Sequence, residues 1–168
     1  IMDGSALEFV SGFLRVGFVN QTAPVRALEI LEKVEVDENG AYAALEPYSG
    51  IKMDFMIDFP DVAIGQQSKS LDLANGSFVN ELSNSRTFCA NSDVNTMRSK
   101  GLALGGTLMN ALVVDGENVL SPGGMRYPDE PVRHKMLDAV GDLALAGGPI
   151  IGHYIGRRSG HTATNKLL

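Results

Sequence analysis

One helix restricts the folds open to this chain, because its sequence places apolar residues on two opposite faces. One face consists of residues that recur every three or four positions: Val132, Met136, Val140, Leu143 and Gly147. The opposite face carries Leu137, Gly141 and Leu145. A face that only met water would not repeat leucine. We therefore expect one face of the helix to lie on a sheet, and the other to meet something outside its own domain.

The second face also carries a polar stripe. His134, Asp138 and Asp142 follow one another at intervals of four residues, which places them in a stripe about 80° wide on a helix. An imidazole and a carboxylate on adjacent turns can bind one divalent metal, and the next carboxylate can orient a further histidine. The same spacing also fits the wet side of an ordinary amphipathic helix. A third ligand is not evident, since His153 lies beyond the break at 147–149.

Composition excludes several classes of protein. The 168 residues are 44% hydrophobic and 20% charged with a net charge of −6, so we expect one soluble domain without a basic surface for nucleic acid. The pairs Arg133/Lys135 and Arg157/Arg158 suit either a small anion or a solvated surface. The single Cys89 excludes an internal disulfide and favours a packed thiol. The longest apolar stretch, 143–151, is too short for a membrane span.

Periodicity and turn residues predict the remaining elements. Helices are expected at 5–17, 76–84 and 129–147, and another is expected to be capped by Ser92 or Asp93 and to end at Gly101. Hairpins are expected around 37–40 and over 108–120, a half-buried strand at 51–59, and polar loops at 20–24 and 65–70. Strands and helices mix without strict alternation. This pattern predicts an α+β fold with a mostly antiparallel sheet.

Several segments together resemble a known family. They are Met-Asp-Gly-Ser-Ala at 2–6, the strand at 54–59, Ser-Arg-Thr-Phe at 85–88, the helix at 132–142 and Ser-Gly-His at 159–161. In this order the chain resembles the second half of the zinc-dependent UDP-(3-O-acyl)-N-acetylglucosamine deacetylases, LpxC. The resemblance implies a two-layer α/β sandwich domain over 23–168, with a β-α-β unit inserted at about 90–114. Residues 1–22 would be the final helix and linker of a truncated first domain.

The resemblance also implies a catalytic site that this chain supplies only in part. His134 and Asp138 would bind Zn²⁺, and His161, with Asp142 as its partner, would be the charged residue near the oxyanion or leaving amine. Thr87 would hydrogen-bond the tetrahedral intermediate. The family's third zinc histidine and its general-base glutamate lie in the first domain, upstream of Met2. The pair Cys89-Ala90 and Pro131 depart from the family pattern and affect the expected fit of the substrate.

Substrate contacts follow from the same resemblance. Lys135 would face the phosphates of the nucleotide, Arg158 would assist as a basic residue, and Phe59 would lie near the uracil ring. The inserted unit would form a hydrophobic passage for the fatty acyl chain. Its expected lining is Val94, Gly106, Thr107 and Val113.

The expected activity is removal of acetate from UDP-(3-O-acyl)-N-acetylglucosamine in lipid A biosynthesis. The expected location is the cytoplasm, with peripheral contact to a membrane left open, and the expected partner is the missing first domain. Alternatives are a non-catalytic fragment that binds zinc or the nucleotide, and a degenerate homologue. We expect the chain alone to be inactive, and to associate through Leu137 and Leu145 if these side chains are exposed.

Overall fold

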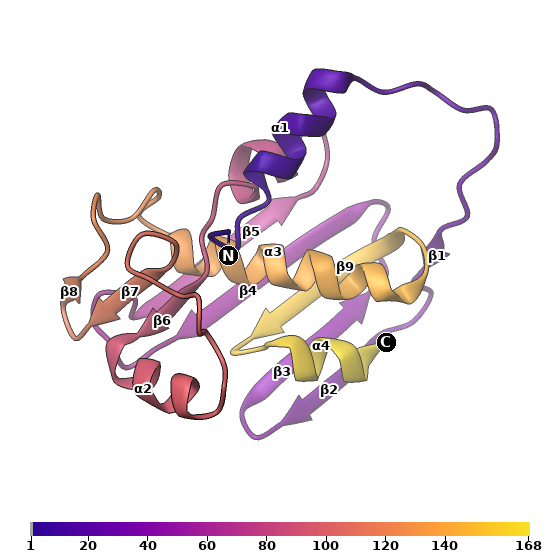
Figure 1. Ribbon diagram of the computed structural model, residues 1–168. Coiled ribbons are helices and arrows are strands. Elements are labelled where there is room, and N and C mark those ends of the chain that lie inside the picture. Colours follow the sequence, from indigo (N-terminus) through magenta and orange to yellow (C-terminus); the bar gives the residue numbers. More distant parts are fainter. Residues whose placement is uncertain (1) are drawn as a thin grey trace.

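A mixed sheet forms the centre of the computed structural model, which describes residues 2–168 (Figure 1). The strand order is β2-β3-β9-β4-β5. In chain order these are β2 (Val34–Glu38), β3 (Ala41–Glu46), β4 (Ile51–Asp58), β5 (Gln66–Asp72) and β9 (Ile150–Arg157). The short β1 (Leu28–Glu29) also pairs with β9. The predicted α+β class is confirmed. The sheet is mixed, because β9 is parallel to β4 and β1 but antiparallel to β3.

Local sequence signals account for the hairpin and the central strand. Asn39 and Gly40 have φ angles of 52° and 79°, the left-handed conformation that a tight hairpin turn requires, and they join β2 to β3. In β4, Met53, Phe55 and Ile57 are buried on the inner face of the sheet, as the alternating pattern predicts.

The predicted polar loop at 65–70 is wrong, because these residues belong to strand β5. This strand pairs antiparallel with β4 along its length. Two of its three inward positions, Gln67 and Lys69, are polar, and only Leu71 packs against the core, so a search for alternating hydrophobic residues missed the strand. Gln67 bonds to the carbonyl of Ile64, and Lys69 forms ion pairs with Glu81 and Asp129 at 3.0 and 3.6 Å.

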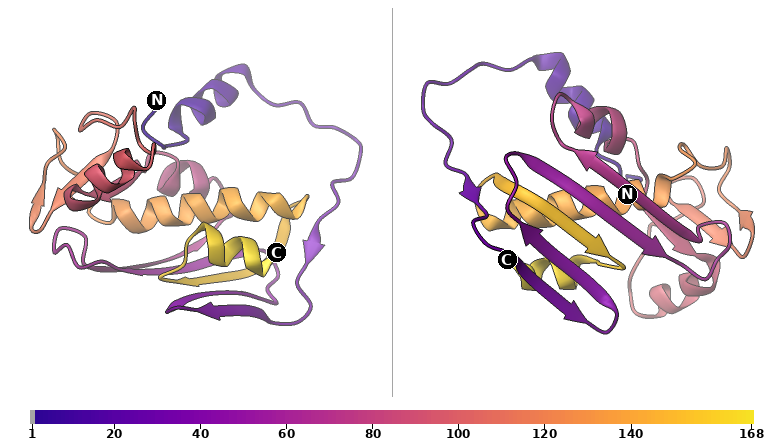
Figure 2. Two further views of the ribbon diagram at one scale, coloured as in Figure 1. Left: turned by 60° about the horizontal axis from the view of Figure 1, so that its bottom comes forward. Right: turned by 180° about the vertical axis from the view of Figure 1, so that it is seen from behind.

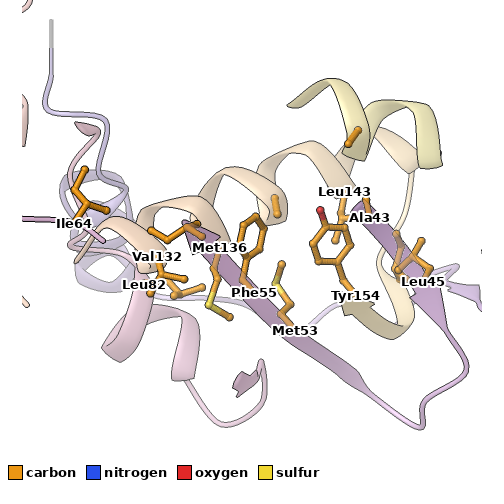
Figure 3. Packing of buried hydrophobic residues seen from close by; sticks show 14 of the residues in the cluster. Ala43, Leu45, Met53, Phe55, Ile64, Leu82, Val132, Met136, Leu143 and Tyr154 are labelled. Carbon is orange, nitrogen blue, oxygen red and sulfur yellow. The ribbon is translucent and has the colours of Figure 1, made fainter. Parts of the chain in front are cut away.

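Helices cover one face of this sheet, as the left view of Figure 2 shows. The longest is α3 (Glu130–Leu143), followed by a 3₁₀ turn, η2 (Ala144–Ala146), and by Gly147 at φ 84°. The shorter α4 (His161–Leu167) packs beside it. Val132, Met136 and Leu143 of α3 lie in the core (Figure 3), so the predicted inner face is confirmed up to Leu143. The predicted end at 147 is wrong, because the α-helix ends at Leu143 and Gly147 is exposed in the turn after η2. On the other face Leu145 is 72% exposed, whereas Leu137 is half-buried.

The helix α1 (Leu7–Val16) confirms the expectation for 5–17 and buries none of its residues. Phe9, Phe13 and Leu14 are 58%, 65% and 53% exposed. Figure 1 shows α1 standing away from the sheet and joined to β1 by a long segment. No helix within 2–168 is both long and apolar enough to cross a membrane.

A β-α-β unit lies at one end of the sheet. Strand β6 (Phe88–Ala90) is parallel to β7 (Leu112–Asp115), α2 (Asn91–Ser99) forms the crossover, and β8 (Asn118–Val119) pairs with β7. The predicted cap at Ser92 or Asp93 is wrong, because α2 starts at Asn91 after an extended Ala90. The expected hairpin forms, but its first strand starts at Leu112 because residues before it form turns. The short helix expected at 76–84 is the π-helical η1 (Phe78–Leu82).

Candidate functional site

The polar stripe of α3 brings an imidazole and a carboxylate together. His134 is 6% exposed, and its Nε2 lies 3.3 Å from Oδ1 of Asp138. Its Nδ1 lies 3.0 Å from the carbonyl oxygen of Ser85. Because a carbonyl can only accept, Nδ1 carries the proton, and in the neutral ring the lone pair of Nε2 faces the carboxylate.

The donor set of this pair fits a cation. Two ligands of one tetrahedral zinc, each about 2.0–2.2 Å from the ion, lie about 3.3–3.6 Å apart. The separation of 3.3 Å between Nε2 of His134 and Oδ1 of Asp138 is at the short end of this range. A lone pair and a carboxylate oxygen repel each other unless a proton or a metal ion lies between them. Within 2–168, no cluster of three or more His, Cys, Asp or Glu side chains could hold a metal ion.

Lys135 restrains the same carboxylate from its other side. Its Nζ lies 3.1 Å from Oδ2 of Asp138, an i,i+3 pair on the helix surface. Oδ2 is therefore engaged by the ammonium group, while Oδ1 is directed toward His134. This arrangement leaves one oxygen of Asp138 for a metal.

His161 meets the last member of the stripe. Its Nδ1 lies 2.9 Å from both carboxylate oxygens of Asp142, and its side chain is 62% exposed, whereas that of Asp142 is only 12% exposed. A carboxylate can only accept, so Nδ1 is the donor in this contact and Nε2 is directed away from it. The predicted partnership of His161 with Asp142 is thus present in the geometry.

A small basic cavity of about 140 Å³ adjoins the stripe. It is lined by Ile57, Asp58, Phe59, Lys135, Arg158 and Ser159. The three residues assigned to the nucleotide by resemblance, Phe59, Lys135 and Arg158, therefore share one cavity although they are far apart in sequence. Arg158 forms an exposed ion pair with Asp58 at 3.0 Å.

A larger apolar pocket of about 430 Å³ lies against the β-α-β unit. Its lining includes the expected Val94, Gly106, Thr107 and Val113, and it also includes Thr87. Phe88 connects this pocket to the stripe, because its ring lies edge-on to His134 at 6.2 Å between centroids. It also lies edge-on to Phe59 of the basic cavity at 5.3 Å. Phe88, which lines the apolar pocket, therefore contacts both the ring of His134 and the lining of the basic cavity.

Comparison with known proteins gives the family of this chain. Residues 1–168 match the family described as LpxC: UDP-3-O-acyl N-acetylglycosamine deacetylase. This chain belongs to that family. Among its relatives, the UDP-3-O-acyl-N-acetylglucosamine deacetylases of Neisseria meningitidis serogroup C and Bdellovibrio bacteriovorus are 45% and 44% identical over 170 and 168 residues. The match covers all of this chain but 55% and 56% of those relatives. The chain spans about half the length of the curated relatives it matches.

Sequence reasoning on this LpxC chain missed some residues around the site. Met2 lines the apolar pocket and was not predicted to do so, whereas Cys89, which also lines it, had been expected to affect the fit of the substrate. Burial and, to a lesser extent, Asp93 raise the pKa of the Cys89 thiol, as expected for a packed thiol and not for a nucleophile. The available signals were that Met2 belongs to the motif at 2–6 and that Cys89 follows the motif at 85–88. The buried partners Arg86 and Glu130 were also missed, since 44 residues separate them.

Two basic or imidazole groups lie outside the site. His153 is bonded to Asp54 at 2.8 Å between strands β9 and β4, on the sheet face opposite the core. Arg133 is bound to Asp129 and Glu81, both at 2.6 Å, and its guanidinium lies over the Tyr127 ring. Of the pair Arg133/Lys135 expected to suit an anion, only Lys135 lines the basic cavity.

Proposed function

We propose that this chain supplies one half of the catalytic centre of a zinc-dependent deacetylase acting on UDP-(3-O-acyl)-N-acetylglucosamine in lipid A biosynthesis. The observation that carries the proposal is the His134–Asp138 pair, whose facing atoms are 3.3 Å apart and whose Nδ1 proton is bound by Ser85. His161 and Asp142 follow on the same side of α3. The names of the relatives support the substrate class.

His134 and Asp138 would hold the zinc, together with a ligand from a domain that precedes this chain in the parent protein. Zinc bound there would supply Lewis-acid polarisation of the acetamide carbonyl and of water. The hydroxyl of Thr87 would donate to the developing oxyanion. The protonated His161, held by Asp142, would give a proton to the leaving amine as the C–N bond breaks and acetate is released.

The two hollows would bind the ends of the substrate. In the basic cavity Lys135 and Arg158 would contact the diphosphate, and the ring of Phe59 would lie near the uracil. The apolar pocket would take the acyl chain along Val94, Gly106, Thr107 and Val113. We place this reaction in the cytoplasm.

The first test uses the full-length parent protein with His134→Ala, and with His153→Ala as the matched control on the opposite sheet face. His134→Ala should lose stoichiometric zinc in metal analysis, whereas His153→Ala should keep it. Retained zinc in His134→Ala would remove this residue from the ligand set.

A second test separates proton transfer from metal binding. His161→Ala should keep zinc and lower the rate by about 10²–10⁴, the range for a positioned acid or base. An unchanged rate would reject this role for His161.

A second candidate function is a non-catalytic fragment that binds zinc or the nucleotide. It is favoured by the finding that no third metal-binding side chain joins the pair within the described part of the chain. Acetate release from the substrate by these 168 residues alone would exclude it; a full-length protein that binds zinc but does not turn over would support it.

A further inference from the structure

A fully buried ion pair anchors the start of α3. Glu130 has no exposed surface and Arg86 is 5% exposed. The guanidinium donates through Nε to Oε1 at 2.9 Å and through Nη2 to Oε2 at 3.0 Å. The backbone N–H groups of Arg86 and Arg126 also donate to this carboxylate, to Oε1 at 2.9 Å and to Oε2 at 2.7 Å. Both oxygens of Glu130 are therefore satisfied.

Stability alone is a poor explanation for such a pair. Burial would raise the pKa of the Glu130 carboxyl, but the hydrogen bonds from Arg86 and from the backbone lower it below its ordinary value. The pair thus stays ionised. Desolvation makes buried ion pairs no better than well-packed apolar residues in many proteins, which points to a role in positioning.

The pair acts on the site through one peptide group. The backbone N–H of Arg86 donates to Glu130, and the carbonyl of the same peptide unit, from Ser85, accepts from Nδ1 of His134. Glu130 and His134 are one helical turn apart on α3. A planar peptide held by Glu130 at its N–H end must present its carbonyl at the opposite end, toward His134.

We propose that Glu130 and Arg86 are positioning residues that hold this peptide and thereby make Nδ1 the protonated nitrogen of the neutral His134 ring, so that Nε2 is the nitrogen directed at Asp138. Arg86 fixes the carboxylate, the carboxylate fixes the peptide N–H, and the peptide carbonyl fixes the tautomer. The inference rests on the proposed function only in naming His134 as a zinc ligand. The tautomer itself is a property of this chain without metal.

The test measures the tautomer of His134 directly. Nitrogen-15 chemical shifts of the imidazole, followed on the metal-free chain over a pH series until the ring holds a single proton, distinguish Nδ1–H from Nε2–H. The unmodified chain should show Nδ1–H as the dominant form. Dominance of Nε2–H would overturn the proposal without any variant.

Variants then assign the effect to the buried pair. Glu130→Gln keeps the shape but lacks the charge, so the folded chain should lose Nδ1–H as the dominant form. Asp129→Asn is the matched control, because it breaks a neighbouring ion pair with Arg133 that does not touch Ser85. It should lower stability and leave the tautomer unchanged. An unchanged tautomer in folded Glu130→Gln, or an equal change in both variants, would refute the role.

The conservative Glu130→Asp covers the case in which Glu130→Gln does not fold. It keeps the charge but withdraws it by one methylene, so the share of the Nδ1–H tautomer of His134 should fall, by less than in Glu130→Gln. An unchanged share of Nδ1–H would count against the proposal. Zinc content and turnover of the parent protein are measured separately. Failure of the tautomer test therefore leaves the proposed deacetylase function standing, and failure of zinc binding leaves the tautomer result standing.

Discussion

Removal of one buried hydroxyl, in Tyr154→Phe, should destabilise the region that carries His161. Tyr154 lies on β9 and is 1% exposed. Its hydroxyl lies 3.1 Å from the Ser159 hydroxyl and 2.9 Å from that of Thr164. Phenylalanine keeps the ring in place beside Phe55, so the substitution removes the polar contacts and little packing.

The magnitude follows from what happens to the two partners. Thr164 keeps its bond to the carbonyl of Gly160 at 3.2 Å, and is 1% exposed. Ser159 is 5% exposed, and Tyr154 is the side-chain partner described for its hydroxyl. A lost net hydrogen bond costs about 1 kcal/mol and an unsatisfied buried hydroxyl about 1–3 kcal/mol, so we expect a loss of about 2–3 kcal/mol.

A second substitution tests the physical reason. Ser159→Ala removes the hydroxyl that Tyr154→Phe leaves unsatisfied, so the double variant should be more stable than the two single losses added together predict, by about 1 kcal/mol.

The assay is urea unfolding followed by far-ultraviolet circular dichroism, since the chain has no tryptophan. The slope of free energy against urea should stay constant. Measurements at several protein concentrations separate unfolding from association through the exposed α1. A loss below about 0.5 kcal/mol for Tyr154→Phe, or additive effects in the double variant, would refute the reasoning.

Three further predictions concern the site and its surroundings. Gly4→Ala should lower the free energy of unfolding by about 1–3 kcal/mol, because Gly4 has φ 78° and a Cβ there would lie 2.9 Å from Cβ of Thr87. The control Gly12→Ala, in open space on α1, should be neutral or stabilising. Equal unfolding free energies for the two variants would contradict this. Val94→Phe should weaken binding of an alkyl-chain probe to the apolar pocket by about tenfold or more in a fluorescence titration, and unaltered affinity would place the probe elsewhere. The pKa values of Asp129 and Glu130 are lowered below their ordinary values of 3.8 and 4.5, so the folded state binds fewer protons at these carboxyls than the unfolded state does. Their contribution to stability is complete above the ordinary pKa values and should be lost as the pH falls through the pKa values of the folded state. A free energy of unfolding that is flat from about pH 5 to pH 2 would disprove this.

Features governed by neighbouring residues were predictable from the sequence. The turn at Asn39-Gly40, the left-handed Gly147 after η2 and the inner face of α3 each depend on residues within a few positions of one another. The strand β5 was not predictable in this way, because its inward Lys69 is neutralised by residues from η1 and from the start of α3. A lysine can point inward only where such partners exist, and these come from elsewhere in the chain.

The candidate site shows the same division. Spacing on α3 was enough to place His134, Asp138 and Asp142 on one stripe, because a helix repeats its faces every three to four residues. The partner of each came from a distant segment: Ser85 for the ring of His134, and His161 for Asp142. Motif resemblance had anticipated the second contact but not the first.

By itself the sequence determined most of the local elements, the stripe and the membership of the LpxC family, since each of these depends on residue type and short-range spacing. Only the tertiary structure decided that Glu130 and His134 bind the two ends of one peptide group, and that Phe88 links the apolar pocket to His134 and to the basic cavity. Such contacts depend on how elements pack across the core. That packing is set by the sum of many weak contacts, and no single motif encodes it.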